Sequence, residues 1–247
     1  MRILAVKCLS LAAVLLAAGP AHAIELTIDP SQSTMTLDST SFSPFMLPGT
    51  TKPDGDATSL SGSLSAQITS DSFQLLDGSV LVADDHGAFL PGVPSDMGTP
   101  APASFAFSYP SAAVTGVDLE VAIRHMTLSM IDAAPRSLTG GVLGAGVPDF
   151  AVLSGEGHLN VGNPPVTPLP VYTVTTLSSE VGSYSLSGDL LSVMIPFEVD
   201  VSVGGASPST TIYSGQIVAS GTVPEPAASC LAAIALAAAG FLRWRRG

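Results

Sequence analysis

Apolar and polar residues alternate with a period of two through most of the chain between its two ends. In residues 60–69, leucine, glycine, alanine and isoleucine take the even positions, and serine, glutamine and threonine take the odd ones. Such spacing puts one kind of side chain on each face of an extended strand. Further strands are predicted at 24–29, 33–38, 72–77, 79–83, 104–109, 149–159, 171–177, 183–188, 190–203 and 210–221. The pattern therefore predicts an all-β fold, an antiparallel sandwich or barrel.

The alternation changes parity within one long apolar segment. The apolar residues fall on odd numbers before Arg124 and on even numbers after His125, namely Val117, Leu119, Val121 and Ile123, then Met126, Leu128 and Met130. One extra residue in a strand, a β-bulge, produces such a shift. The sequence predicts a bulge at Arg124–His125, with a helix as the alternative for this segment.

Glycine recurs in a short apolar-Ser-Gly pattern. The glycines are Gly62, Gly155, Gly188 and Gly215. Their spacing is irregular, which excludes a repeat array. We expect these glycines where a strand coils or another sheet packs closely. A separate glycine-rich stretch, 140–146, is predicted to be a loop and not a phosphate-binding turn, because no amphipathic helix follows it.

Residues 1–23 have the order of a secretory signal peptide. Arg2 and Lys7 precede the apolar run Cys8–Ala18, a Gly-Pro pair follows it, and Ala21 and Ala23 supply small residues before the body of the chain. Signal peptidase recognises this order and is expected to cleave after Ala23. The apolar run is too short for a permanent transmembrane helix. The sequence therefore predicts export, with a flanking signal helix that is removed.

A second apolar run lies at the other end of the chain. Ala227–Leu242 contains 16 residues without a charge, and Arg243, Arg245 and Arg246 follow it. At 1.5 Å per residue the run spans about 24 Å as a helix, somewhat less than the ~30 Å hydrocarbon core of a bilayer. Basic residues beyond a span favour the cytoplasmic side. The sequence predicts a transmembrane helix at 227–242, a basic tail that anchors it, and a body outside the cell.

The tripeptide Pro224-Glu225-Pro226 stands immediately before this apolar run. Prolines do not join a helix interior, so they keep the approach to the membrane extended. A signal peptide, Pro-Glu-Pro, an apolar helix and a terminal arginine cluster, in this order, resemble the PEP-CTERM sorting signal of bacterial exosortase substrates. The resemblance implies a sorting signal at 223–247, recognised through the tripeptide by an exosortase-like membrane enzyme. It also implies a transient anchor, followed by a cell-surface or extracellular location.

The remaining part, residues 24–222, suits one β-rich extracellular domain and is strongly acidic. It holds 19 of the 20 acidic residues and only Lys52, Arg124 and Arg136 as basic ones, which gives a net charge of −16. This excludes nucleic acid as a partner, because phosphate binding needs clustered lysine and arginine. Both cysteines, Cys8 and Cys230, lie in the two ends. The domain therefore has no disulfide, thiol nucleophile or thiolate-bound metal.

The domain shows no pattern typical of an active site. It contains no Gly-x-Ser-x-Gly sequence, and His86, His125 and His158 are separated from one another along the chain. Each histidine is interpreted as a surface or packing residue. Glu198 and Asp200 share one face of a predicted strand, which indicates an acidic solvent face rather than an acid–base pair. We expect no catalytic residues and no enzyme activity.

Calcium is the one ligand that the acidic composition favours, and no other cofactor is expected. Asp54 and Asp56 flank a glycine in a turn, and Asp84 and Asp85 follow a predicted strand. Carboxylate oxygens are ligands that Ca²⁺ prefers. Neither segment matches the EF-hand loop, so the alternative interpretation is that all four aspartates are turn residues.

Parts of the domain are similar to known sequences over short stretches. Segments 24–33, 195–201 and 214–219 are similar to the bodies of PEP-CTERM proteins of uncharacterised role. The opening is also similar to the Ile-Asp-Pro-x-x-Ser start of YceI-like lipid-binding barrels, with Gln32 where that family tends to carry histidine.

These features favour a secreted protein with a structural or adhesive role at the cell surface or in the extracellular matrix, with exopolysaccharide as a candidate partner. The alternative function is a binding module for calcium, carbohydrate or an apolar ligand.

Overall fold

The structure, a computed structural model, describes residues 22–42, 47–51, 54–87, 102–109, 119–160, 166–168, 172–176, 180–203 and 209–224. The strands are β1 (His22–Ile28), β2 (Thr34–Phe42), β3 (Leu47–Pro48), β4 (Thr50–Thr51), β5 (Ala57–Ile68), β6 (Ser72–Leu75), β7 (Val80–Ala83), β8 (Phe105–Tyr109), β9 (Leu119–Asp132), β10 (Arg136–Thr139), β11 (Val142–Gly146), β12 (Pro148–Asn160), β13 (Val166–Pro168), β14 (Tyr172–Thr176), β15 (Glu180–Ser187), β16 (Leu190–Val203) and β17 (Ser209–Thr222). The all-β prediction is confirmed, since every regular element of the described residues is a strand.

The two predicted flanking helices lie outside the described residues, apart from the end of the signal peptide. Within those residues no helix is long and apolar enough to span a membrane. β1 begins at His22, so it includes the last two residues before the predicted cleavage site. Cleavage after Ala23 remains a prediction. It would leave the pairs from Ile24↔Ala66 to Thr27↔Ser63 in place between β1 and β5.

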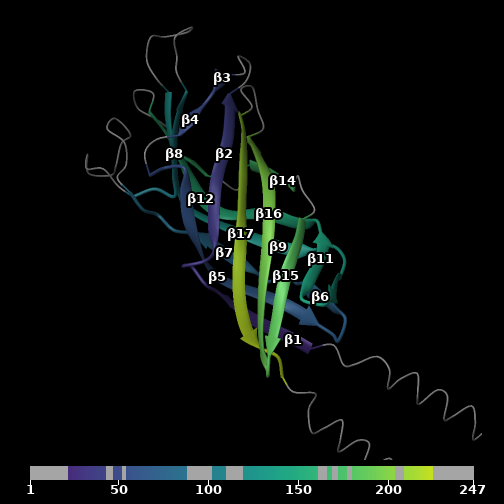
Figure 1. Cartoon of the computed structure of the whole chain (residues 1–247). Coiled ribbons are helices and arrows are strands. Elements are labelled where there is room, and N and C mark those ends of the chain that lie inside the picture. Colours follow the sequence, from purple (N-terminus) through teal and green to yellow (C-terminus); the bar gives the residue numbers. More distant parts are fainter. Residues whose placement is uncertain are drawn as a thin grey trace, which may run out of the picture.

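All of these strands belong to one antiparallel sheet (Figure 1). Its hydrogen-bonded neighbours form a closed ring that runs through β5, β1, β17, β16, β15, β11, β10 and β6 and returns to β5. The sheet therefore closes on itself in the manner of a barrel and is not divided into two separate sheets. A branch leaves β5 through β7, β9 and β12.

The core is one apolar cluster to which the ring strands and the strands β7, β8, β9 and β12 all contribute, and it uses the alternate positions that the sequence pattern identifies. On β16 the buried side chains are Leu191, Val193, Ile195, Phe197, Val199 and Val201. The ring of Phe197 packs on Phe150 of β12 with centroids 5.3 Å apart, and Phe105 of β8 packs on Tyr213 of β17 at 4.9 Å. Each fully buried large apolar side chain stabilises the fold by about 1.5–3 kcal/mol. Apolar burial can thus hold the domain together without a disulfide.

The predicted bulge is confirmed, and the helix alternative for the same segment is wrong. β9 is a strand throughout, but two steps on β12, from Ser154 to Glu156, face three steps on β9, from Thr127 to Arg124. His125 has a φ of 52°. After it the even-numbered Met126, Leu128 and Met130 are buried. The extra residue therefore transfers the core-facing positions from odd to even numbers.

The glycine-rich stretch is a hairpin and not the predicted loop. Gly140 and Gly141 form its turn with φ of 59° and 86°, and β10 and β11 pair on either side. Glycine adopts such angles without a steric penalty. The sequence pattern missed β11 because only Leu143 of this strand is buried, which leaves no alternation to read. The short strands β3, β4, β10 and β13 also lie outside the predicted segments, since two to four residues are too few to show a period.

The turn between β1 and β2 is held by Asp29. Its carboxylate accepts hydrogen bonds from the Ser31 hydroxyl at 2.6 Å, the Gln32 side-chain amide at 2.7 Å and the Ser31 backbone N–H at 3.0 Å. The Ser31 hydroxyl first, and then Gln32, hold the pKa of Asp29 below its ordinary value. Because the pKa of Asp29 is lower in the folded protein than in the unfolded chain, these hydrogen bonds stabilise the fold at pH values above the ordinary aspartate pKa. This stabilisation is lost as pH falls through the folded-state pKa.

Gly215 on β17 is a position where close packing requires glycine, as the sequence predicts. A Cβ there would lie 2.2 Å from the Thr34 carbonyl oxygen and 2.7 Å from Cζ of Phe197. Thr34 is fixed in the ladder between β2 and β17, and Phe197 is buried in the core. We expect Gly215→Ala to reduce the free energy of unfolding by about 1–3 kcal/mol, measured by urea denaturation. Ser214→Ala, which adds no atoms, is the control, and equal stability of the two variants would contradict this account.

Candidate functional site

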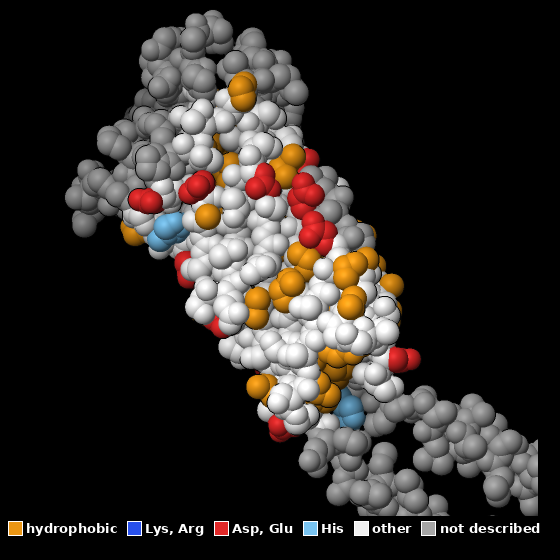
Figure 2. Space-filling model, in the orientation of Figure 1, with side chains coloured by type: hydrophobic (Ala, Val, Ile, Leu, Met, Phe, Trp, Pro, Cys, Tyr) orange, Lys and Arg blue, Asp and Glu red, His pale blue; other side chains and the backbone are white. Residues whose placement is uncertain are grey.

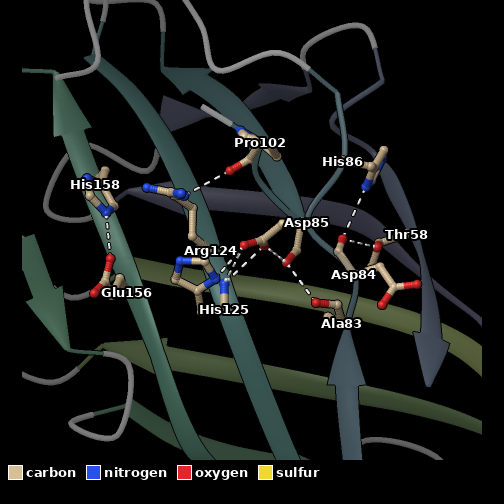
Figure 3. A network of polar contacts seen from close by, with 11 residues as sticks. Thr58, Ala83, Asp84, Asp85, His86, Pro102, Arg124, His125, Glu156 and His158 are labelled. Carbon is tan, nitrogen blue, oxygen red and sulfur yellow. Dashed lines mark hydrogen bonds and ion pairs between the residues drawn. The ribbon is translucent and has the colours of Figure 1, made fainter. Parts of the chain in front are cut away.

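A polar cluster surrounds Asp85, two residues after the end of β7 (Figure 3). Oδ1 of Asp85 accepts a hydrogen bond from the Ser104 hydroxyl at 2.7 Å, and Oδ2 lies 2.6 Å from Nδ1 of His125. The backbone N–H of His125 donates to both carboxylate oxygens, at 3.0 and 3.2 Å. Asp85 thus joins the end of β7 to the start of β8 and to the bulge of β9.

His125 combines a strained backbone with an oriented ring. Its φ of 52° lies in the left-handed region, which is uncommon for residues other than glycine. The side chain is 60% exposed, whereas that of Asp85 is 15% exposed. An aspartate that fixes one imidazole nitrogen is found at catalytic and metal-binding histidines. Together, the Nδ1 contact and the two backbone hydrogen bonds to Asp85 hold both the ring and the main chain of His125 at the bulge.

Two substitutions at His125 separate the backbone cost from the side-chain contact. His125→Gly and His125→Ala both remove the ring, but only glycine adopts a positive φ without a steric penalty. We expect the glycine variant to be more stable than the alanine variant by about 1 kcal/mol, measured by urea denaturation. If alanine were as stable as glycine, the positive φ would not be a cost that Asp85 offsets.

Asp84 and Asp85 are neighbours in sequence, but their carboxylates turn to opposite sides (Figure 3). The Asp84 carboxylate accepts hydrogen bonds from the hydroxyls of Ser59 at 2.6 Å and Ser61 at 3.4 Å, both on β5. Its carbonyl oxygen lies 3.2 Å from Nδ1 of His86. Both carboxylates are therefore already bonded to groups of the protein.

The structure brings the two predicted acidic segments next to each other. A Cβ at Gly87 would lie 3.7 Å from the carbonyl oxygen of Asp54, so the turn at 54–56 borders the Asp84–Gly87 segment. Asp54 and Asp56 are exposed. Among the described residues, no three His, Cys, Asp or Glu side chains are grouped in a way that could hold a metal ion. Calcium binding at these aspartates stays a prediction.

The remaining polar pairs are consistent with the interpretations made from the sequence. Nε2 of His158 lies 3.1 Å from Oε2 of Glu156 on β12, and the His158 side chain is only 7% exposed, so it is a packing residue. Glu198 and Asp200 lie on the outer side of β16, half-buried, opposite the buried alternate positions. Asp200 accepts a hydrogen bond from the Ser202 hydroxyl at 2.8 Å.

A buried ion pair, which the sequence analysis did not identify, connects β9 to β10. Arg136 and Asp132 are 2% and 3% exposed, and Nη2 of Arg136 lies 2.6 Å from Oδ1 of Asp132. Nε of Arg136 also donates to both carboxylate oxygens, at 2.9 and 3.0 Å. The Leu75 N–H donates to Asp132 as well, at 3.1 Å. A signal was present, since Arg136 is one of three basic residues in an acidic domain and follows an aspartate by four residues.

The end of the last strand leads directly into the predicted sorting tripeptide. β17 ends at Thr222, and the Val223 N–H donates to the Asp189 carbonyl oxygen at 2.7 Å. Val223 packs against the core, and Pro224 is exposed. The other predicted tail and cleavage residues lie outside the described residues, namely Ala21, Glu225, Pro226, Arg243, Arg245 and Arg246.

A family model described as the PEP-CTERM protein-sorting motif matches residues 222–246. The chain carries a PEP-CTERM sorting motif. The match begins at the last residue of β17 and covers the tripeptide, the apolar run and the arginines. The motif indicates an exported protein that an exosortase processes at the membrane and that then reaches the surface. No curated protein and no solved structure matches the chain.

Proposed function

We propose that this protein is a structural or adhesive component of the cell surface or of the extracellular polymer matrix. The PEP-CTERM motif at 222–246 is the observation that carries the proposal, because it directs the chain to exosortase processing outside the cytoplasm. The proposal includes signal peptidase cleavage after Ala23, a transient anchor at Ala227–Leu242 and exopolysaccharide as the partner of the released domain.

The features of the domain support a structural role, which depends on a stable fold, and not a catalytic one. Its strands pack around one buried apolar cluster, and its net charge of −16 keeps it well hydrated and apart from other acidic surfaces. The oriented Asp85–His125 pair is accounted for by the bulge that it fixes. We therefore propose that the protein is not an enzyme.

Fractionation of the native host tests the proposal. The domain should be found with the cell-surface polymer, and enzymatic removal of the polysaccharide should release it. In cells without the exosortase it should remain in the membrane fraction. A domain that is free in the medium whether or not the polymer is present would overturn the structural role. Retention that depends on calcium and not on polysaccharide would favour the calcium-binding alternative.

A further inference from the structure

Both connections between the described domain and the rest of the chain leave from the same end. β1 pairs antiparallel with β17, with Thr27 opposite Ser220, and β17 ends two residues further on at Thr222. A Cβ at Gly221 would lie 2.4 Å from the Glu25 carbonyl oxygen, so the start of β1 runs beside the end of β17. In Figure 1 this is the lower end of the molecule, where β1 and the ends of β15 and β17 meet. We call it the exit end.

The turn between β15 and β16 projects at the exit end and carries two exposed leucines. Leu186 is 58% exposed and Leu190 is 47% exposed. The three residues between them, Ser187, Gly188 and Asp189, are exposed too. The turn is bonded directly to the departing chain, through the hydrogen bond from Val223 N–H to the Asp189 carbonyl oxygen at 2.7 Å. Figure 2 shows hydrophobic side chains gathered over the lower part of the visible face, with acidic ones mainly above them.

The connection between Pro224 and the apolar run is short, and this keeps the β15–β16 turn close to the membrane in the anchored precursor. Ala227, where the apolar run begins, is three residues after Pro224 and can lie at most about 11 Å from it. In the anchored precursor the exit end is therefore held within about 11 Å of the start of the apolar run, a reach that covers the headgroup layer of roughly 5–8 Å and a few ångströms beyond it. Apolar side chains held at that depth lower their free energy by entering the interface.

We propose that the β15–β16 turn docks on the lipid surface in the membrane-anchored precursor, with Leu186 and Leu190 in the interfacial layer. The proposal rests on the anchoring of the tail that is part of the proposed function. It gives the short apolar run a second membrane contact. It also presents the tripeptide to the processing enzyme at a fixed height. The lipid is zwitterionic, because an acidic domain is repelled by an anionic surface.

Depth-dependent fluorescence quenching tests the docking. The full-length chain, purified from cells without the exosortase and with Cys8 and Cys230 changed to serine, carries a bimane label at Ser187→Cys or at Thr210→Cys. Thr210 pairs with Ser202 on β16, and Ser202 is 12 positions along β16 from Leu190, next to the other label site. At about 3.3 Å per position, the two label sites are about 40 Å apart. The probe is a phosphatidylcholine vesicle with spin-labelled lipid.

We expect at least about twofold stronger quenching at position 187 than at position 210, as for a group within the interface. Leu186→Ser with Leu190→Ser should reduce the quenching at position 187, although the tail still holds the exit end near the membrane. Val147→Ser with Leu153→Ser is the matched control. It removes two side chains that are similarly exposed, at 51% and 48%, and it should leave the quenching at position 187 unchanged. Chains that float with the vesicles but show no quenching at 187 would overturn the docking alone. Chains that do not float would overturn the anchoring as well.

Discussion

Arg136→Ala is expected to destabilise the domain by about 3–5 kcal/mol, because it leaves the buried Asp132 carboxylate without its cation. Domains of this kind are stable by only about 5–15 kcal/mol in total, so a large fraction of stability would be lost. The measurement is urea denaturation followed by far-ultraviolet circular dichroism. Arg124→Ala, which removes a half-buried arginine from β9, is the control and should cost far less.

A double variant distinguishes the burial of a charge from the loss of packing. Asp132→Leu with Arg136→Met removes both charges and keeps apolar volume, so it should be more stable than Arg136→Ala. Nη1 of Arg136 has no hydrogen-bond partner among the described residues, which adds to the cost of keeping the charge buried. If the double variant were no more stable than Arg136→Ala, the ion pair would not be the source of the effect.

Pro224→Ala with Glu225→Ala is expected to block nearly all maturation while membrane insertion continues. In the proposed function, recognition resides in the tripeptide and anchoring in the apolar run and its arginines, all of which lie within the matched sorting motif. The precursor should accumulate in the membrane fraction of the native host. Thr222→Ala, at the end of β17 and outside the tripeptide, is the matched control and should mature normally. Normal maturation of the double variant would show that the tripeptide is not the recognition element.

Replacing Arg243, Arg245 and Arg246 with glutamine should differ in its effect on membrane retention. Each arginine costs about 2.5–3.5 kcal/mol to move to the centre of a bilayer, so the cluster keeps a short span from sliding through. Without it, precursor retention and processing should both fall. Separate effects of the tripeptide and the arginines on insertion and maturation would establish that the two segments have different roles.

The class of the fold could be predicted from the sequence because long strands such as β5 and β16 have one buried face. β5 and β16 alternate cleanly, and the parity change at Arg124–His125 located the bulge. β11 was missed because it buries one apolar side chain and is otherwise glycine and exposed residues. Closure of the sheet was left open, since the pairing of β10 with β6 and of β11 with β15 joins segments far apart in sequence.

Among the polar sites, too, local patterns could be predicted from the sequence and contacts that depend on tertiary packing could not. The tail motif could be read from the sequence because an extended recognition segment and an apolar helix are both local patterns. The contact between Asp85 and His125 could not, because 40 residues separate them and only the bulge turns the His125 N–H toward the carboxylate. The Asp132–Arg136 pair is close in sequence, but its burial depends on the packing of β6 and β11 around it.

The intact mass of the protein recovered from the surface of the native host is the most direct test of the account. Cleavage at both ends predicts a chain that starts at Ile24 and ends before the arginine cluster, without the apolar run Ala227–Leu242. A chain that still ends at Gly247 and stays in the membrane fraction of cells with an active exosortase would contradict it.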